Sequence, residues 1–255
     1  LHFERLQREC SINPGASLEK EIEYFRSLET TIWSKVDAVL YPSLEEAETV
    51  RRLLPSANVA AVSPYVYEGI DVFSQRAPVQ GKKIIFVAGF GHPPNTDAAV
   101  WFVKDIFPII KIQYPDAELY LIGSNPTDQV MQLKSNSIHV TGYVTDEDLA
   151  AHYASARVAV VPLRFGAGVK NKVVEAMAYG VPLITTPVGV QGLEGAAEII
   201  PVVSEPQAFS EAVCSVLASE EDWSRYSMKG NAYIASRYSL DAMKQSLAIA
   251  FGISE

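Results

Sequence analysis

Residues 158–186, VAVVPLRFGAGVKNKVVEAMAYGVPLITT, restrict the possible folds of this chain more than any other stretch. The stretch begins with Val158 to Leu163, an apolar and mostly β-branched run that is typical of a parallel strand buried on both faces. A glycine-containing turn follows, and from Val169 onward apolar residues recur at helical spacing until Gly180 and the nearby proline. A second apolar run completes the stretch. The pattern predicts a strand, a helix and a second strand of one parallel sheet.

The turn between this first strand and the helix predicts an anion site. The unpaired N–H groups and the dipole of a helix amino terminus favour a negative ligand, and Gly166 and Gly168 allow the backbone to turn there. Lys170 and Lys172 lie in the first helical turn, where a cation opposes the dipole unless an anion compensates it. No Asp or Glu occurs in residues 149–174, although the whole chain has a net charge of -9. We therefore expect a phosphate or pyrophosphate site. The alternative is that the glycines serve only the turn and the lysines are solvated.

The rest of the chain predicts a regular alternation of strands and helices. After a linker at residues 63–81, we expect strands at 84–88, 118–122, 138–140 and 198–203, and helices at 97–114, 128–133, 146–156 and 206–218. Such alternation with short loops is typical of a doubly wound, Rossmann-like α/β fold. Before the linker we expect one helix ending near Lys35, a short strand, a helix after Ser43 with Glu46 in a capping box, and another strand. Two helices follow residue 220, and we expect the last to cross back to the first part of the chain.

Ligands of doubly wound folds bind at the carboxyl ends of the strands, so two further loops are candidate binding segments. The segment GFGHPPN contains Gly89, Gly91 and Asn95, whose backbone amides could approach a ligand; a purely structural turn is the alternative. The segment GYV contains Tyr143 and Val144, and the tyrosine ring is a candidate surface for a nucleobase. A half-buried core tyrosine is the alternative for Tyr143.

Composition excludes several classes of function. The acidic balance argues against a nucleic-acid partner, and the two cysteines are far apart, which indicates reduced thiols and a cytoplasmic protein. The dispersed histidines, His92 among them, lack metal-site spacing, so we predict no metal and assign them structural roles. No apolar run is long enough to span a membrane. The chain starts at Leu1, within a charged and helix-like stretch, and we expect a fragment or a processed piece.

Residues 82–195 resemble the carboxyl-terminal nucleotide-sugar-binding domain of the GT-B retaining glycosyltransferases of family four. The segments that carry the resemblance are FVAGFGHPPNTDAAVWF, LYLIGSNP, VTGYVTDEDLAAHYASARVAVVPLRFGAGVKNKVVEAMAYGVPLITTPVGVQGL, with their order and spacing preserved. Residues 37–55 and the linker resemble the end of the family's amino-terminal domain. The resemblance implies a GT-B type α/β fold with a truncated second domain. Its parts would be 1–75, the end of the acceptor domain with the hinge; 76–236, the donor-binding domain; and 237–255, a terminal helix packing on the first domain.

The resemblance also implies roles for individual residues. Glu175 matches the second glutamate of the family's Glu-x7-Glu motif and would hold the ribose, whereas the first glutamate, which contacts the donor sugar, is replaced by Ala167. The family's diphosphate-clamping arginine and lysine are absent from the first loop. A subgroup with a G-x-G-x-K-x-K segment is similar instead, in which a lysine supplies that charge. The expected diphosphate site comprises Gly166, Gly168, Val169, Lys170, Lys172, Gly89, Gly91 and Asn95, and the expected base site comprises Tyr143 and Val144.

The function that this resemblance implies is transfer of a sugar, with retention, from a nucleoside-diphosphate sugar to a saccharide, lipid-linked or protein acceptor. Fixed cations and amides would stabilise the leaving diphosphate, so no metal or other cofactor is expected. The residues indicate no catalytic group. Two alternatives stay open, namely a nucleotide-sugar epimerase of GT-B architecture and a domain that binds a nucleotide sugar without catalysis, as Ala167 suggests.

Overall fold

A five-stranded parallel sheet forms the centre of the larger part of the molecule. The computed structural model describes residues 1–12, 16–67 and 76–253, and its larger sheet has the strand order β5-β4-β3-β6-β7. The strands are β3 (Lys83–Val87), β4 (Glu118–Ile122), β5 (Ile138–Gly142), β6 (Val158–Val161) and β7 (Leu183–Thr185). Every residue of β6 is buried, as its uninterrupted apolar sequence predicts. The order confirms the doubly wound fold, because the chain reverses direction across the sheet between β3 and β6.

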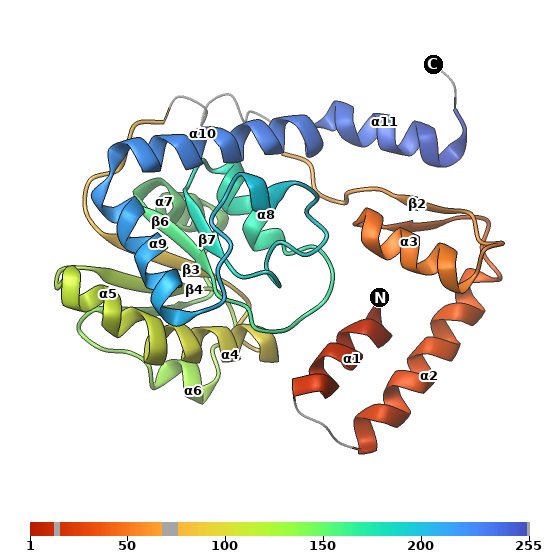
Figure 1. Ribbon diagram of the computed structural model, residues 1–255, viewed down its shortest axis with the longest axis horizontal. Helices are drawn as coiled ribbons and strands as arrows, with labels where there is room; N and C mark the ends of the chain where they lie inside the picture. The colour runs from red at the N-terminus through yellow and green to blue at the C-terminus, as the bar shows by residue number, and fades with distance from the viewer. Residues whose placement is uncertain (13–15, 68–75, 254–255) are drawn as a thin grey trace.

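Helices cover the two faces of this sheet (Figure 1). They are α4 (Pro93–Trp101), α5 (Phe107–Gln113), α6 (Asp128–Met131), α7 (Asp146–Ser155), α8 (Asn171–Ala178), α9 (Pro206–Ala218) and α10 (Glu220–Arg237). Helix α9 packs against α5, whereas α8 packs against α10. The buried core between the layers includes Phe86, Phe102 and Phe209, whose rings pack in edge or stacked contacts with their neighbours.

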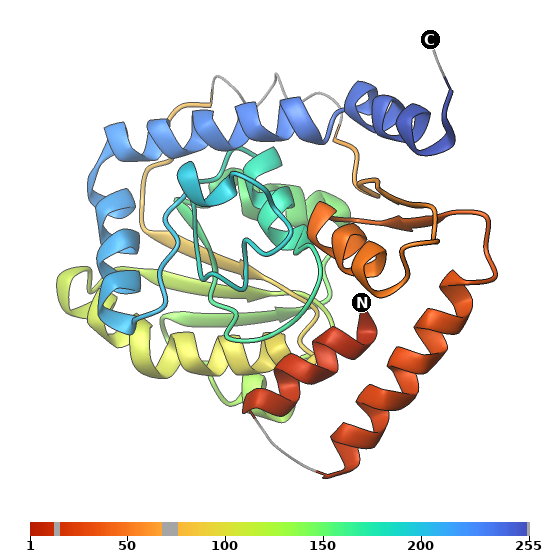
Figure 2. The same cartoon turned by 45° about the vertical axis from the view of Figure 1, so that its right-hand side comes forward.

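A smaller parallel sheet of two strands forms the rest of the molecule. Strands β1 (Val39–Tyr41) and β2 (Val59–Ala61) pair in parallel, and α3 (Leu44–Leu53) connects them along the chain. Ser43 caps α3 as the capping box predicts, since its Oγ accepts a hydrogen bond from Glu46 N at 3.2 Å. Helices α1 (His2–Ile12) and α2 (Ala16–Trp33) pack together beside this sheet. In Figure 2, α1 lies between α2 and the loops of the larger sheet.

The chain returns to the smaller sheet at its end. Helix α10 runs along the larger sheet, and α11 (Leu240–Phe251) continues beyond it and contacts β2 (Figure 1). At the junction of the two helices, Tyr67 N donates a hydrogen bond to Tyr238 O at 2.9 Å. Residues 68–75 of the predicted linker lie outside the described residues. Within the part of the chain that the structure describes, no helix combines the length and the apolar character needed to cross a membrane.

Three predicted elements differ from those observed. The single amino-terminal helix is wrong, because two helices flank residues 13–15, whose sequence Asn-Pro-Gly disfavours a continuous helix. The helix predicted at 97–114 begins at Pro93 and is interrupted by a π-helical turn, η2 (Phe102–Ile106). This turn ends two residues before Pro108, which has no N–H to donate. The strand predicted at 198–203 is replaced by a 3-10 turn, η3 (Ala196–Glu198), and one isolated bridge from Val202 to Thr185.

The missing strand has a local cause. The N–H groups of Ile199 and Ile200 both donate to Ala196 O, at 3.1 and 3.2 Å, so neither is free to pair with β7. Strand β6 also ends earlier than predicted, at Val161, and α8 begins later, at Asn171. The turn between them is therefore longer than the sequence indicated, which leaves residues 162–170 available to line a pocket.

Candidate functional site

A pocket lies where the loops that follow β3 and β6 meet. These strands are neighbours at the point where the strand order reverses, the usual ligand position of doubly wound folds. The cavity has a volume of about 320 Å³. Its walls come from four segments, and the lining residues include Arg5, Tyr65, His92, Pro94, Asn95, Leu163, Phe165, Gly166, Ala167, Val169, Lys170, Asn171 and Lys172. Five of the eight predicted diphosphate-binding residues are among them.

Glycine is needed at two positions of the loop before α8. Gly166 has φ 142° and Gly168 has φ 71°, both in the region that residues with a Cβ rarely adopt. A Cβ at Gly166 would also lie 3.4 Å from Lys170 Cε. The two glycines thus allow the loop to bring the lysine chain back over its own turn. Lys170 is the N-cap residue of α8 and makes no side-chain capping bond.

Two lysine amines lie within this pocket. Lys170 is only 9% exposed, and its Nζ donates to Gly168 O. Lys172 Nζ donates to Asn95 Oδ1 and lies 5.6 Å from the centroid of the Phe86 ring. Burial is the main cause that lowers the pKa of each amine to about 8. A nearby positive charge lowers it further. For Lys170 this charge is that of Arg8, and for Lys172 it is that of Lys170. Neither amine forms an ion pair with a carboxylate of the described residues, so an anion in the pocket would be favourable to both.

The two arginines of residues 149–174 have structural roles. Arg164 forms an ion pair with Asp97, with Nε 2.8 Å from Oδ2. Arg157 is buried and donates to two backbone carbonyls, those of Val216 at 3.0 Å and Val79 at 2.9 Å. The absence of acidic residues in that stretch of sequence therefore does not isolate Arg164, because α4 supplies Asp97, and the charge of Arg157 is directed at backbone carbonyls away from the pocket. Of the four cations, only the two lysines line the pocket.

The loop after β3 contributes side chains more than backbone amides. Asn95 is buried, donates from Nδ2 to Gly89 O at 2.8 Å and accepts from Lys172, so it connects the two loops. Gly89 does not line the pocket, and Gly91 lines a separate cavity along α4. A Cβ at Gly91 would lie 3.2 Å from Asn125 Cβ, so this glycine serves close packing between loops.

Glu175 lies one helical turn beyond the pocket, on α8. Its Oε2 accepts a hydrogen bond from Tyr153 OH at 2.9 Å, and the Tyr153 ring stacks on Tyr179 with centroids 4.5 Å apart. Burial raises the pKa of the carboxyl group, the Tyr153 bond opposes the rise, and the Asp146 charge adds to it. Tyr67 OH donates to Asn171 Oδ1 at 2.9 Å, and Glu175 contributes, after burial, to raising the pKa of this tyrosine.

Tyr67 therefore links the pocket wall to the Glu175 region. Sequence analysis did not single it out, and the only signal was its position in the aromatic linker SPYVYEGID.

The predicted base-binding residues lie outside the pocket. Tyr143 is 78% exposed at the carboxyl end of β5. Val144 is half-buried, packs on the core, and lines a shallow groove along α7. The structure thus excludes the core role for the Tyr143 ring and leaves its face accessible. Asp146, two residues further on, acts on the Glu175 carboxyl group, so the GYV segment lies on the Glu175 side of the pocket.

Two basic residues of the pocket were not predicted as site residues. Arg5 reaches it from α1, and His92 lies directly before α4 without a side-chain capping bond. Burial lowers the pKa of His92, and the charge of Arg5 lowers it further. One turn further along the same face of α1, Arg8 Nη1 donates to Gly166 O at 3.2 Å, which holds this helix against the glycine loop. Arg5 and Lys170 are far apart in sequence, and no periodicity connects them.

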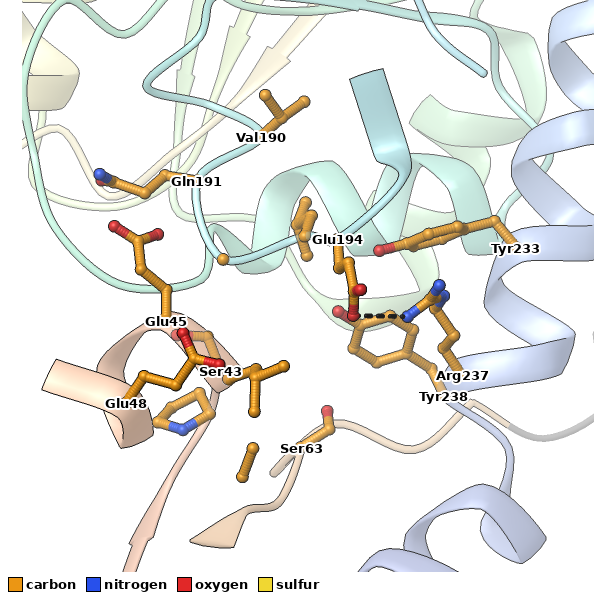
Figure 3. A pocket seen from close by; sticks show the side chains of 15 residues that line it. Ser43, Glu45, Glu48, Ser63, Val190, Gln191, Glu194, Tyr233, Arg237 and Tyr238 are labelled. Carbon is orange, nitrogen blue, oxygen red and sulfur yellow. Dashed lines mark ion pairs between the residues drawn. The ribbon is translucent and has the colours of Figure 1, made fainter. Parts of the chain in front are cut away.

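A second cavity, of about 650 Å³, lies between the smaller sheet, the loop after β7 and the end of α10 (Figure 3). Its charged lining residues are Glu45, Glu48, Glu194 and Arg237, and the last two form an ion pair at 3.6 Å. Three carboxylates against one guanidinium disfavour a phosphate ligand. The described residues contain no group of three His, Cys, Asp or Glu side chains arranged to hold a metal ion. The basic pocket is therefore the candidate site for an anionic ligand.

A family model described as "Glycosyl transferases group 1" matches residues 81–219. A Klebsiella pneumoniae protein described as "Uncharacterized 44.6 kDa protein in cps region" is 25% identical over 195 residues, which cover 71% of this chain and 48% of that protein. The chain therefore spans about half the length of the curated relative that it matches.

Solved structures share the fold at low sequence identity. A mutant of S. aureus TarM, in complex with Fondaparinux, alpha-GlcNAc-glycerol and UDP, superposes with a TM-score of 0.71 at 12% identity, over 94% of this chain and 48% of that one. Sucrose-phosphate synthase from Thermosynechococcus elongatus gives 0.67 at 20% identity, over 89% and 60%. The pneumococcal O-GlcNAc transferase GtfA, in complex with UDP and GlcNAc, gives 0.66 at 15% identity, over 89% and 47%. These likenesses support the GT-B, Rossmann-like fold.

Proposed function

Because this chain belongs to the family Glycosyl transferases group 1, we propose that it binds a nucleoside-diphosphate sugar and takes part in transferring the sugar to an acceptor. The observation that carries the proposal is the pair of lysine amines, Lys170 and Lys172, in a pocket at the amino end of α8. Each lacks a carboxylate partner among the described residues, and a diphosphate supplies the missing negative charge. Membership in a family of transferases favours sugar transfer over epimerisation.

The order of the side chains along the sheet edge supports the orientation of the donor. The diphosphate contacts Lys170 and Lys172, and Asn171 with Tyr67 leads from there to Glu175. Glu175 would accept hydrogen bonds from the ribose hydroxyls. The base would lie beyond it, toward Tyr143 and Val144. The neighbouring TarM and GtfA structures contain UDP, which makes uridine the first base to test.

The finer parts of the hypothesis rest on the family-four resemblance. They are retention at the anomeric carbon, a donor-binding part at residues 76–236, and transfer without a metal ion. Lys170, Lys172 and the first-turn amides of α8 would stabilise the departing diphosphate as the sugar acquires positive charge. The acceptor would be a saccharide, a lipid-linked group or a protein, and the activity would be cytoplasmic. The chain covers about half of its relative, so these properties are proposed for the whole protein.

Nucleotide binding provides the direct test. We expect UDP, GDP, ADP or dTDP to raise the melting temperature, since ligand at 100 times its dissociation constant stabilises by about 2.7 kcal/mol. The variant Lys172→Met keeps the aliphatic chain over Phe86 but removes the charge, and should weaken binding by about tenfold or more in calorimetric titration. Lys229→Met, at an exposed position on α10, is the matched control. Unchanged affinity in Lys172→Met would remove the assignment.

Product analysis of the full-length protein separates the three hypotheses. Released nucleotide together with a glycosylated acceptor supports transfer. A changed sugar that is still attached to the nucleotide supports epimerisation. Tight binding without turnover supports a domain that binds but does not catalyse.

A further inference from the structure

Two basic side chains line the pocket in addition to the two lysines that would bind a diphosphate. Its ionisable lining residues, apart from Tyr65, are Arg5, His92, Lys170 and Lys172, and none of the lining residues is an Asp or Glu. The diphosphate of a nucleotide sugar carries one negative charge on each phosphate, and the two lysines of α8 match these charges. Arg5 and His92 line the pocket from two other segments, α1 and the loop after β3. They remain without an anion from the diphosphate.

Ala167, at the centre of the glycine loop, also affects which sugars the pocket can bind. Ala167 lines the pocket between the two glycines and has no group that could bond to a sugar hydroxyl. A carboxylate at this position would neutralise part of the positive charge and would repel an anionic sugar. With alanine there, the pocket lining offers a sugar the guanidinium of Arg5 and the imidazole of His92, and no carboxylate. A cationic, water-accessible wall favours a negatively charged sugar over a neutral one.

We infer that the donor sugar carries a carboxylate, as a hexuronate does, and that Arg5, assisted by His92, recognises it. The inference rests on the proposed function and names its substrate class. The guanidinium of an arginine presents paired N–H donors that match the two oxygens of a carboxylate. A lysine could not replace it equally well, because it lacks this planar pair of donors.

The groups around Arg5 and His92 are compatible with this role. Arg5 Nη1 donates to Glu9 Oε2 at 3.2 Å, and Nη2 lies 3.4 Å from His2 Nε2. The Glu9 pair is partly exposed and lies on α1 itself, four residues away, so it orients the guanidinium while leaving donors for a ligand. The charges that act on His92 are those of Arg5, Lys172, Glu9 and Lys170. Three of these four are positive, and a bound carboxylate would favour the protonated imidazole.

A matched pair of donors tests the inference. The pair comprises a neutral sugar and its uronate on the nucleoside diphosphate that binds, namely UDP-glucose and UDP-glucuronate where that nucleotide is UDP. We expect the uronate to bind the protein about tenfold more tightly in calorimetric titration. Arg5→Gln should reduce this preference to within about twofold while affinity for the nucleoside diphosphate stays within about twofold. Arg26→Gln, at an exposed position on α2, should keep the wild-type preference.

A second measurement makes the result independent of how well Arg5→Gln folds. In the wild-type protein, lowering the pH from 7.5 to 5 should increase the preference for the uronate, because the lowered pKa of His92 places its protonation at the acidic end of this range, and His92→Gln should remove this increase. Equal or tighter binding of the neutral sugar by the wild-type protein would overturn the inference and leave the nucleotide site intact. Failure of every nucleoside diphosphate to bind would instead overturn the proposed function, and the inference with it.

Discussion

The amines of Lys170 and Lys172 titrate in a range where most lysines stay charged. Burial lowers the pKa of each to about 8, below the unfolded value of 10.5. Below about pH 8 both amines are charged, and the folded protein bears the full cost of burying them. Between about 8 and 10.5 the folded protein loses these protons before the unfolded chain does. These two groups therefore make the free protein relatively more stable as the pH rises through that window.

Anion binding should show the opposite trend. A diphosphate needs the charged amines, so its affinity should fall by roughly tenfold or more between pH 7 and pH 9, as each lysine loses most of its charge. Calorimetry in buffers of different ionisation enthalpy should also detect proton uptake on binding near pH 8. Lys172→Met should have a shallower pH dependence than the wild type. An affinity that is flat from pH 7 to pH 9 would mean that these amines do not contact the ligand.

Sequence analysis could identify these lysines because helical spacing and the two glycines place them in one turn. It could not identify Arg5, because the packing of α1 against the glycine loop brings together segments separated by most of the chain. His92 lies within a predicted binding segment but was assigned a structural role, because its spacing from the other histidines indicated no metal site. The absence of Asp and Glu from residues 149–174 also did not reveal that Arg157 and Arg164 have partners in distant elements. Local sequence patterns indicate the backbone conformation and the direction of the helix dipole. The pairing of charges depends instead on contacts between segments that are distant in sequence.

At the scale of elements, apolar runs and caps predicted most of the larger sheet. Strand β4 and helix α9 have the predicted bounds, because Pro206 begins the helix and a continuous apolar pattern follows. The prediction failed at residues 198–203, where an apolar run does not form a strand. It also failed at α1 and α2, where one periodic stretch of sequence forms two helices. At residues 198–203 the hydrogen bonds of a turn decided the structure rather than hydrophobic periodicity.

The glycine at the end of β4 offers a test of close packing between loops. Gly123 has φ 138°, and a Cβ there would lie 2.1 Å from Ala88 O, a backbone atom of the neighbouring loop. Gly123→Ala should therefore lower the free energy of unfolding by on the order of 3 kcal/mol. Gly142→Ala is the control, since Gly142 has φ 75° but a Cβ added to it would meet no atom within 4 Å. The control should cost only about 1 kcal/mol. Equal losses in urea titration would show that backbone strain, and not the contact, determines the effect.

At the scale of the molecule, Arg76 fixes the segment that leads into the larger sheet. Its Nη1 donates to Tyr179 O at 3.1 Å and its Nη2 to Tyr153 O at 2.9 Å, so one guanidinium contacts the carboxyl ends of α7 and α8. Helix carboxyl ends favour a cation, and the guanidinium also lies 5.7 Å from the Trp223 ring centroid. One side chain thus joins the incoming chain to three helices.

Removing this guanidinium should be costly although it forms no ion pair with a carboxylate of the described residues. Arg76→Ala should lower the free energy of unfolding by about 2 kcal/mol, because partly buried carbonyls at the ends of two helices lose a charged donor. Arg225→Ala, at an exposed position on α10, should leave it nearly unchanged, because exposed ion pairs contribute little to stability. Thermal and urea unfolding of both variants would measure the difference. Similar stabilities would indicate that water replaces the guanidinium at the helix ends.

The hydrogen bond between Tyr67 N and Tyr238 O joins two segments that run in opposite directions between the sheets. The chain leaves the smaller sheet through the first segment and returns to it through the second, where α11 reaches β2. The two connections between the sheets therefore lie beside each other at this point. The basic pocket has α1 on one wall and α8 on the other, so a rotation of one sheet relative to the other about these connections would change the width of the pocket.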